Sequence, residues 1–412
     1  MRRVSRAYQD SPPALVLGGP WITTLCVIRN LGRKGIRQFA VGTGESFVAS
    51  SRWHRRLPAI LESQVTPDAL PELLAALSRE RMVLFPCSDD WTLAASDLEP
   101  ALAAQFPAIV ASRDTVETLI DKGRFAEILQ YLALPHPRTT CIGPCDNLDG
   151  LPDEVFQQAF IKPRNSMAFA GRYGVKALGF TTRSEAQKRL TEIWQAGHEV
   201  VLQEYIPGPP TGHYMLEGFV DRSGRVLAWC ARRRLRMYPE DYGDSSWMVT
   251  VPLRDVAAAA ETLIRLFSAL RYRGVFEAEF KYDERDGAFK LLEVNSRPWS
   301  FVGFAARCGV DVCELAYCEA VGLPLAPVTT YDIGRYCVQY AVDGRVCWRL
   351  FRAGRLRLWD WVKSWLSASP VVFCLDDPAP ALVRIRRALR RRLGRVRWTA
   401  DALTSGAGLR RL

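Results

Sequence analysis

Three polar residues stand at alternate positions where an apolar, strand-like segment of the chain ends. The segment LLEVNSRPWS carries Glu293, Asn295 and Arg297, and Pro298 then stops the strand. Alternate residues of an extended strand point to the same face, so these three side chains are predicted to share one side. Carboxylate and amide oxygens are ligands for Mg²⁺, and arginine binds phosphate or carboxylate oxygens through two nitrogen atoms.

The segment that precedes this one supplies a further acid. GVFEAEFKYD and AFKLLEVNSR are predicted to pair as an antiparallel hairpin across the turn ERDG. The alternation points Leu292 and Val294 toward the core and brings Glu279 beside Glu293 and Asn295. Two carboxylates repel each other unless a cation is present, so the hairpin is predicted to bind a metal ion. A solvated strand face would instead mix lysines with the acids and would place no asparagine beside the proline.

Strand-like and helix-like segments alternate near the N-terminus. ALVLGG, IRQFAVG and MVLFPC are predicted strands, and a helix is predicted over Thr23–Leu31. This alternation is typical of a parallel α/β sheet, whose ligands bind beyond the carboxyl ends of the strands. The segments Gly18–Trp21 and Ser88–Asp90 are therefore predicted to line a pocket, and Ser88 or Asp89 is predicted to cap the following helix.

The middle of the chain is predicted to change from helix to antiparallel strands. One helix is predicted over Thr115–Leu132. A second, over 254–271, carries Leu263, Leu266, Phe267 and Leu270 on one face. The strands predicted between these helices are AFIKP, EVVLQEY, GHYMLEGFVD and RVLAWCARRRLRMYP. The chain has no Walker A loop, which argues against a P-loop fold.

The pattern Glu-x-Asn-x-Arg, with an acid on the neighbouring strand, resembles the metal site of the ATP-grasp superfamily. The resemblance implies that Glu279, Glu293 and Asn295 hold Mg²⁺, with Mn²⁺ as the alternative ion, on the β- and γ-phosphates of ATP. The motifs DKGRF and FIKP are similar to two lysine motifs of the superfamily. They imply phosphate contacts for Lys122 and Lys162.

Three further motifs match in the order that the superfamily shows. AGRYGVKA resembles the flexible flap that closes over the phosphates, where Gly171 and Gly174 allow the backbone to approach them. ARRRLRMYP resembles the strand that aims a base at the transferred phosphoryl group, and Arg234 is assigned that role among four arginines. VLQEYIPG resembles the hinge whose backbone binds the adenine edge. The hinge residues are Gln203, Glu204, Tyr205 and Ile206.

The resemblance also implies the architecture, which combines α/β and α+β parts in an ATP-grasp fold. The expected divisions are a parallel α/β pre-ATP-grasp domain (1–113), a small lid subdomain (114–206), a catalytic subdomain with an antiparallel sheet (207–330) and a C-terminal extension with a basic amphipathic helix (331–412).

The segment EVNSRPWSFVGFAARCGVDVCELAY most resembles the carboxylate–amine ligases that include D-aspartate ligase-like proteins. The resemblance implies that ATP converts a small carboxylate into an acyl phosphate, which an amine then attacks to form an amide or peptide-like bond. Arg297 would offset phosphate charge and steady the intermediate. Two other interpretations stay open: an enzyme similar to biotin carboxylase or carbamoyl-phosphate synthase, and a nucleotide-binding protein without catalysis. The chain lacks a biotinyl Met-Lys-Met site, and its intact acid, amide and arginine set argues for catalysis.

The charge of the chain is concentrated near its C-terminus. The formal net charge is +11, and residues 384–412 hold ten arginines and one acid. The remaining chain is nearly neutral, so a nucleic-acid surface across the body is not indicated. The start of the sequence has no signal-peptide pattern, and its eleven cysteines are therefore predicted to be reduced and mostly buried in a cytoplasmic protein. A homodimer is left open.

The C-terminal region combines tryptophans, an apolar stripe and arginines. Residues 356–375 contain Trp359, Trp361 and Trp365 but are too short and too interrupted to span a bilayer. Residues 381–396 are predicted to form a helix with one apolar face and an arginine-rich remainder. Three interpretations stay open: contact with an anionic membrane surface, which would make the protein peripheral at the inner membrane face, packing on the body, and binding to nucleic acid, the least favoured.

Overall fold

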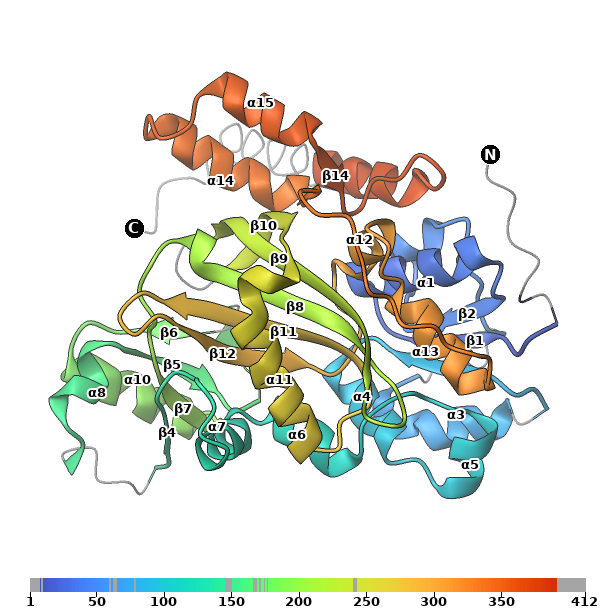
Figure 1. Cartoon of the computed structure of the whole chain (residues 1–412), viewed down its shortest axis with the longest axis horizontal. Helices are drawn as coiled ribbons and strands as arrows, with labels where there is room; N and C mark the ends of the chain where they lie inside the picture. Colours follow the sequence, from blue (N-terminus) through green and yellow to red (C-terminus); the bar gives the residue numbers. More distant parts are fainter. Residues whose placement is uncertain are drawn as a thin grey trace, which may run out of the picture.

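The computed structural model describes residues 8, 10–58, 61, 65–77, 79–144, 150–165, 169, 172–173, 175, 177–239 and 243–390. Three β-sheets form the framework of this part of the chain. The N-terminal sheet lies at one end of the molecule, a small four-stranded sheet lies at the other, and a seven-stranded sheet lies between them (Figure 1).

The N-terminal unit contains a parallel sheet in the order β2-β1-β3, as predicted. Its elements are β1 (Ala14–Leu17), α1 (Ile22–Lys34), β2 (Gln38–Val41), η1 (Val48–Ser50), η2 (Pro67–Ala69), α3 (Leu70–Ala76), β3 (Val83–Pro86), α4 (Asp89–Ser96) and α5 (Pro100–Gln105). Helix α1 ends at Gly35, whose φ of 84° lets its N–H reach the carbonyls of Leu31 and Gly32. Ser88 caps α4, as predicted, because its hydroxyl accepts the N–H of Trp91.

The four-stranded sheet has the order β4-β7-β5-β6, and its pairs are antiparallel. Its elements, with the two helices that lead into it, are α6 (Arg113–Ile120), α7 (Lys122–Tyr131), β4 (Thr139–Ile142), α8 (Asp153–Gln157), β5 (Ala159–Pro163), β6 (Leu178–Gly179), α10 (Arg183–Gln195) and β7 (Val200–Glu204).

The single helix predicted over Thr115–Leu132 is wrong, because the chain forms α6 and α7 with a break at Asp121. Asp121 has an extended backbone (φ −77°, ψ 112°). Its Oδ1 accepts the backbone N–H groups of Gly123, at 2.8 Å, and Arg124, at 3.0 Å. An aspartate in this position caps a helix, so it starts α7 instead of continuing α6.

The seven-stranded sheet has the order β12-β11-β8-β9-β10-β13-β14. Its elements and their neighbours are η4 (Pro210–Gly212), β8 (His213–Val220), β9 (Val226–Tyr238), β10 (Asp244–Thr250), η5 (Leu253–Val256), α11 (Ala257–Ala269), β11 (Gly274–Asp283), β12 (Ala288–Asn295), α12 (Val302–Arg307), α13 (Val312–Val321), β13 (Tyr336–Val338), α14 (Tyr340–Arg352), α15 (Leu358–Leu366) and β14 (Ala368–Pro370). Helix α11 buries Leu263, Leu266 and Phe267 in the core of this unit, as predicted.

The hairpin β11–β12 has the predicted antiparallel pairing, but one side-chain direction was predicted wrongly. Glu279 pairs with Glu293, whereas the next residue, Phe280, pairs with Leu291. Leu292 is therefore the extra residue of a β-bulge and is only partly buried, while Leu291 is buried in the core. The bulge keeps the two glutamates opposite each other and returns the later part of the hairpin to the alternation that buries Phe280.

The C-terminal region is part of the seven-stranded sheet and not a separate body. Strand β13 pairs with β10, and β14 pairs with β13, at the edge of the sheet opposite β12. Residues 379–390 are helical, and the rest of the predicted helix over 381–396 lies outside the described residues. None of the helices in the described ranges has the length and hydropathy needed to cross a bilayer. The described cysteines are free thiols and most of them are buried, as predicted.

Two buried aspartates anchor the C-terminal region. Asp343 of α14 is fully buried and accepts Nε and Nη2 of Arg236, at 2.9 and 2.7 Å, and Nε1 of Trp365, at 2.7 Å. Asp377 accepts Nε of Arg29 at 2.9 Å, and this pair is almost completely buried. The region is thus held to the seven-stranded sheet by Asp343 and to the N-terminal unit by Asp377.

The first anchor yields a stability prediction. Asp343→Ala removes the carboxylate and leaves the guanidinium of Arg236 buried without its charged partner, which typically costs about 3–5 kcal/mol. We expect a clearly lower thermal unfolding midpoint by calorimetry. Asp360→Ala, which changes an exposed aspartate of α15, is the matched control. Equal midpoints for the two variants would contradict the anchoring role.

Candidate active site

Four polar side chains meet on one face of the hairpin. Glu277 lies opposite Asn295, and Glu279 lies opposite Glu293, in the antiparallel register of β11 and β12. Directly opposite residues have Cβ atoms about 4.5–5.5 Å apart, so each pair is in contact range. Nδ2 of Asn295 donates to Oε2 of Glu277 at 3.1 Å. The structure therefore brings the three predicted metal ligands together, with Glu277 as a fourth polar neighbour.

Glu279 is held in its ionised form by neighbours on β8 and β9. Its Oε1 accepts Nη2 of Arg234 at 2.9 Å and lies 2.9 Å from Nδ1 of His213. Burial by itself would raise the pKa of Glu279, but Arg234 and His213 outweigh it and hold the pKa below its usual range. Both contacts use Oε1, and Oε2 of Glu279 makes no hydrogen bond within the described chain.

Glu293 differs from Glu279 because its carboxylate has no hydrogen-bond or ion-pair partner among the described residues. Like charges directly opposite each other destabilise a strand pair, so Glu279 and Glu293 together favour a bound cation. The described part of the chain has no group of three or more His, Cys, Asp or Glu side chains placed to hold a metal ion. The available donor set is therefore two carboxylates and the amide oxygen of Asn295. That set fits Mg²⁺ or Mn²⁺, ions that accept oxygen donors and, for Mg²⁺, retain water and phosphate ligands.

Lys122 and Lys162 contribute positive charge to the same place. Lys122 begins α7, and burial, followed by repulsion from Lys162, lowers its pKa to about 8. Glu293 and Asp89 act in the opposite direction on the pKa of Lys122, so these groups share one electrostatic environment. Nζ of Lys162, on β5, donates to Oε1 of Gln203 at 3.1 Å. The two predicted phosphate-binding lysines are thus close enough to the acidic face to act on its charges.

The predicted hinge is largely engaged in the four-stranded sheet. Gln203 is buried, and its side chain accepts from Lys162. The backbone N–H of Glu204 donates to the carbonyl of Arg138 at 2.8 Å, and that of Tyr205 donates to the carbonyl of Gln158 at 2.6 Å. In the described chain the backbone N–H of Ile206 makes no hydrogen bond. Of the three hinge N–H groups that follow Gln203, that of Ile206 is therefore the one without a hydrogen-bond partner in the described chain, although the residue is buried.

The Glu204 side chain has a separate structural role. Its carboxylate accepts Nη2 of Arg285 at 2.7 Å and the backbone N–H of Arg138 at 3.0 Å. These contacts hold β7 to the loop before β4 and to the turn of the hairpin. Gly171 and Gly174 of the predicted flap lie outside the described residues.

Only one of the four clustered arginines of β9 reaches the hairpin carboxylate Glu279. Arg234 donates Nη2 to Glu279 and Nε to the hydroxyl of Ser245, at 2.7 Å. The other three are engaged elsewhere: Arg232 with Glu217 and Glu277, Arg233 with the carbonyl of Thr211, and Arg236 with Asp343. Arg234 therefore orients a predicted metal ligand.

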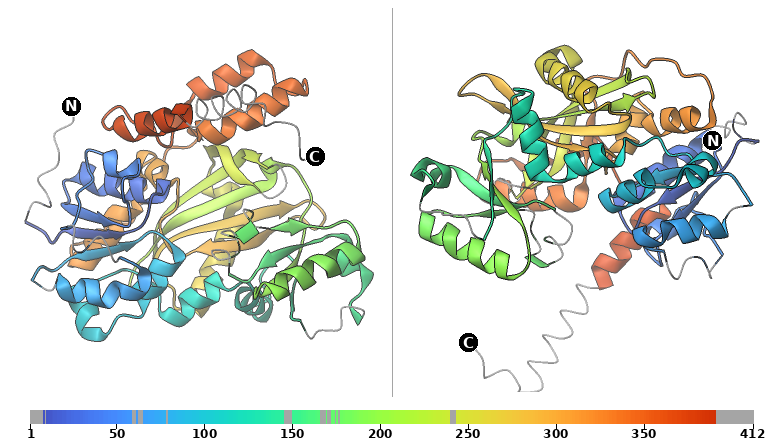
Figure 2. Two further views of the ribbon diagram at one scale, coloured as in Figure 1. Left: turned by 180° about the vertical axis from the view of Figure 1, so that it is seen from behind. Right: turned by 90° about the horizontal axis from the view of Figure 1, so that it is seen from below.

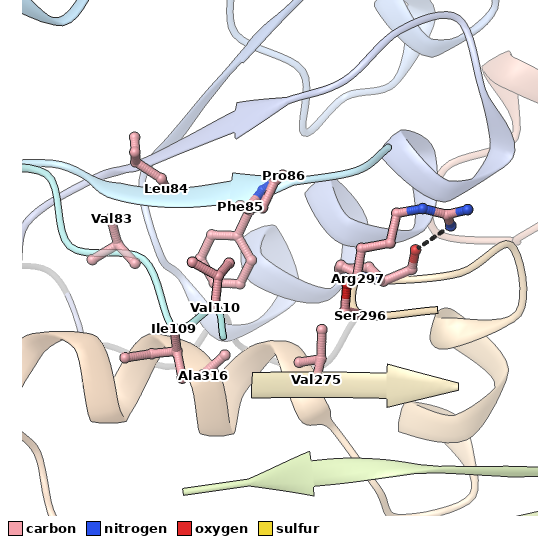
Figure 3. Close-up of a pocket in the computed structure, with 11 residues that line it drawn as sticks. Val83, Leu84, Phe85, Pro86, Ile109, Val110, Val275, Ser296, Arg297 and Ala316 are labelled. Atoms are coloured by element: carbon pink, nitrogen blue, oxygen red, sulfur yellow. Dashed lines mark hydrogen bonds between the residues drawn. The ribbon is translucent and has the colours of Figure 1, made fainter. Parts of the chain in front are cut away.

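Arg297 joins the hairpin to the N-terminal unit. Its Nη2 donates to Oδ1 of Asn295 at 3.1 Å, and its Nε donates to Oδ1 of Asp89, the first residue of α4, at 2.6 Å. Arg297 and Ser296 also line a small pocket that is bordered on the other side by β3, including Phe85 (Figure 3). The contact with Asp89 brings the predicted pocket segment at the start of α4 to the acidic face of the hairpin.

The sequence interpretation missed several residues of this site. Glu277 shares the alternation of Glu279, which was the available signal, but it was not assigned a role. His213 becomes a neighbour of the hairpin only through strand pairing. Asp89 lies in a predicted pocket segment, but its contact with Arg297 was not predicted. Lys281 donates Nζ to the carbonyls of Gly208, at 3.0 Å, and Pro209, at 2.7 Å, and so fixes the loop that follows the hinge.

Comparison with known proteins agrees with the fold. No family model matches the chain. The chain is 27% identical over 260 residues to a D-aspartate ligase of Enterococcus faecium, a match that covers 59% of this chain and 61% of that protein. It is 28% identical over 209 residues to a D-alanine–D-alanine ligase of Acidiphilium cryptum, covering 47% of this chain and 63% of that protein. The chain thus spans about three fifths of the length of these curated relatives.

A solved structure shares the architecture. Biotin carboxylase of Campylobacter jejuni superposes with a TM-score of 0.60 at 16% identity, over 79% of this chain and 74% of that chain. The molecule has the ATP-grasp fold. The chain is also similar in sequence to two carboxylate–amine ligases, as the sequence motifs indicated. The predicted fold class is thus confirmed, except for the basic C-terminal extension, which the comparisons do not cover.

The lowered pKa of Lys122 predicts how stability changes with pH. Its pKa is about 8 in the folded chain and 10.5 as an ordinary value, so the unfolded chain binds more protons between these pH values. The free energy of unfolding therefore rises with pH in that window, and the destabilisation is fully present below pH 8. Lys122→Met removes this contribution, so its thermal midpoint should gain on the wild type most at pH 7 and least near pH 10. Lys188→Met, at an exposed lysine of α10, is the control, and a difference independent of pH would contradict the assignment.

Proposed function

We propose that this chain is an ATP-dependent ligase that activates a carboxylate as an acyl phosphate and joins it to an amine. The observation that carries the proposal is the pair of opposed acids, Glu279 and Glu293, with Asn295 and Lys122 beside them. Such a site accommodates a divalent cation and an anionic ligand together, which phosphoryl transfer from ATP requires. The similarity to D-aspartate ligase and D-alanine–D-alanine ligase supports a small acid and a small amine as substrates.

Most of the predicted site residues have a place in this proposal, whereas Gln203, Glu204 and Tyr205 are engaged in contacts within the protein. Glu279, Glu293 and Asn295 would hold Mg²⁺, which would offset charge on the β- and γ-phosphates when bound. Lys122 and Lys162 would bind phosphate oxygens by charge-assisted hydrogen bonds. The backbone at Ile206, at the end of the hinge, would contact the adenine, and Gly171 and Gly174 would belong to the loop that covers the phosphates. The domain divisions at residues 113, 206 and 330 remain predictions.

The proposed reaction has two steps: transfer of a phosphoryl group to the carboxylate, and then displacement of phosphate by the amine. An oxygen of the substrate carboxylate attacks the γ-phosphorus, the bond from that phosphorus to the β,γ-bridging oxygen breaks, and ADP leaves. The nitrogen of the amine then attacks the acyl carbon, the carbon–oxygen bond to phosphate breaks, and the nitrogen loses a proton. The chain contributes positions and charges and forms no covalent bond with either substrate.

Arg297 and Arg234 have different proposed roles. The guanidinium of Arg297, oriented by Asp89 and Asn295, would stabilise negative charge on the acyl phosphate and on the tetrahedral intermediate. Arg234 would act on the phosphoryl group through Glu279, whose carboxylate it orients. ATP is the proposed phosphoryl donor, so the proposed place of action is the cytoplasm. A homodimer remains a prediction.

The metal assignment is tested by Glu293→Gln. This change removes one anionic ligand at nearly constant volume, and loss of a ligand or its supporting partner typically costs metal affinity by a factor of about 10–100. We expect ADP formation in the presence of amino acid pairs to require far more Mg²⁺, with the thermal midpoint maintained. Glu261→Gln, at an exposed acid of α11, is the control.

The same assay separates the competing reactions. ADP formation by the wild type with bicarbonate and no amine would favour the reaction of biotin carboxylase. Nucleotide binding without ADP formation under any condition would favour a non-catalytic protein. Wild-type Mg²⁺ dependence in Glu293→Gln would remove Glu293 from the site.

The nucleotide assignment is tested by Lys162→Ala. A charge-assisted contact with phosphate contributes about 1.5–3 kcal/mol, so the variant should bind ATP roughly 10- to 150-fold more weakly in isothermal titration calorimetry. Lys188→Ala, at an exposed lysine on α10 of the same unit, should bind ATP like the wild type. Unchanged ATP affinity in Lys162→Ala would exclude β5 from the nucleotide site.

A further inference from the structure

Exposed hydrophobic side chains gather in one region of the molecule. Of the eighteen large hydrophobic side chains that are exposed in the described chain, twelve lie between residues 340 and 389. Single exposed apolar residues are normal on a soluble protein, but a contiguous group marks a contact surface. The helices of this region lie along the same side of the molecule in two opposite views (Figures 1 and 2).

Helix α15 has an outward apolar face. Trp359, Val362 and Leu366 recur at three- and four-residue spacing, which places them on one side of the helix. Trp359 is 70% exposed and Leu366 is 80% exposed. Ser364 is buried and Trp365 is partly buried toward the anchor at Asp343, so the inner face is already used. The outer face is left in contact with solvent.

The other helices of the C-terminal region also expose apolar side chains. Trp348 and Phe351 of α14 are exposed and lie against each other, with ring centroids 6.1 Å apart. The helical residues 379–390 expose three further apolar side chains at helical spacing. These side chains are Leu382, Ile385 and Leu389. We call the exposed faces of α14, α15 and residues 379–390 the C-terminal surface.

The C-terminal surface is strongly basic. Residues 340–390 contain ten arginines and lysines and four aspartates, a net charge of +6. Three of the aspartates are paired with arginines from other parts of the chain: Asp343 with Arg236, Asp376 with Arg33 and Asp377 with Arg29. Asp360 is the fourth. Three of the four aspartates thus neutralise arginines outside this region, so they do not neutralise the arginines and lysines of the region itself.

The surface is held rigidly and at a distance from the catalytic hairpin. Asp343 and Asp377 attach it to two different units of the molecule. Its strands β13 and β14 occupy the sheet edge opposite β12. A partner bound to the C-terminal surface therefore leaves the metal-binding face of β11 and β12 accessible.

We propose that the C-terminal surface binds an anionic phospholipid membrane. Tryptophan rings are favoured at the boundary between headgroups and acyl chains, and helices with an apolar face and a basic remainder lie in that boundary. Arginines attract anionic headgroups while their stems cover apolar area. A second copy of the chain would bring two strongly positive surfaces together, which opposes self-association. This inference goes beyond the proposed function and does not depend on it.

The test is flotation of the full chain with lipid vesicles. The wild type should float with vesicles of phosphatidylcholine and phosphatidylglycerol and stay unbound with phosphatidylcholine alone. The combined variant Trp359→Gln, Val362→Gln, Leu366→Gln should lose at least about tenfold in partitioning, because it removes most of the outward apolar area of α15. The combined control Ile264→Gln, Ile333→Gln changes exposed apolar residues elsewhere and should float like the wild type.

A charge variant tests the electrostatic part. Arg386→Glu with Arg390→Glu should weaken flotation by more than about tenfold, and added salt should have a similar effect. Arg254→Glu, at a residue whose side chain is 87% exposed on η5, is the matched control. Phosphate release with Mg²⁺ and ATP, measured in parallel without lipid, separates this inference from the proposed function.

Several results would overturn the inference. The inference would be wrong if the wild-type protein did not float with vesicles that contain phosphatidylglycerol. It would also be wrong if the protein floated equally with vesicles of phosphatidylcholine alone. Sedimentation that shows a wild-type dimer lost in the α15 variant would assign the surface to a second copy. Flotation that appears only in a chain truncated after Arg390 would show that the following residues cover the surface.

Discussion

Glu279 and Glu293 face each other across two neighbouring strands, and the repulsion between them organises the centre of the molecule. Like charges in this position destabilise a strand pair unless other charges offset them. Arg234 does so for Glu279, which also contacts the His213 ring, while Glu293 lies in the field of Lys122 without a hydrogen-bond partner in the described chain. One acid is thus balanced by direct contact, whereas the second has no such partner in the described chain. In the proposed function, a divalent cation with its phosphate ligands would satisfy both acids and both lysines at once.

A continuous set of polar contacts carries this arrangement across the molecule. Arg232 contacts Glu277, Glu277 accepts from Asn295, and Arg297 donates to both Asn295 and Asp89. The path leads from β9 through the hairpin to the first turn of α4. The N-terminal unit, whose strand ends are predicted to border the substrate pocket, is therefore in direct contact with the groups proposed to bind ATP. Buried polar groups connected in this way favour one geometry, because each of them loses a partner if a neighbour moves.

Paired charges also position the C-terminal region. Its two buried aspartates pair with arginines of the central sheet and the N-terminal unit, and this pairing fixes helices whose outer faces are apolar and basic. From the sequence, packing on the body and contact with a membrane were alternative interpretations. In the structure the inner faces of the helices pack on the body, and their outer faces are exposed. The two interpretations therefore apply to opposite faces of the same helices and do not exclude each other.

The amino-acid order by itself determined the parallel N-terminal sheet, the antiparallel hairpin and the ATP-grasp resemblance, because those depend on local periodicity and on the succession of motifs. It also grouped Glu279, Glu293 and Asn295, since strand alternation places them on one face. Only the tertiary structure decided the bulge at Leu292, where a register shift overrides the expected alternation. The break at Asp121 follows from a local capping carboxylate, a signal that was present in the sequence but was not used in the helix prediction. The partners of the site, from His213 to Asp89, were likewise decided by the tertiary structure, because strand pairing and domain contact join residues that local sequence leaves far apart.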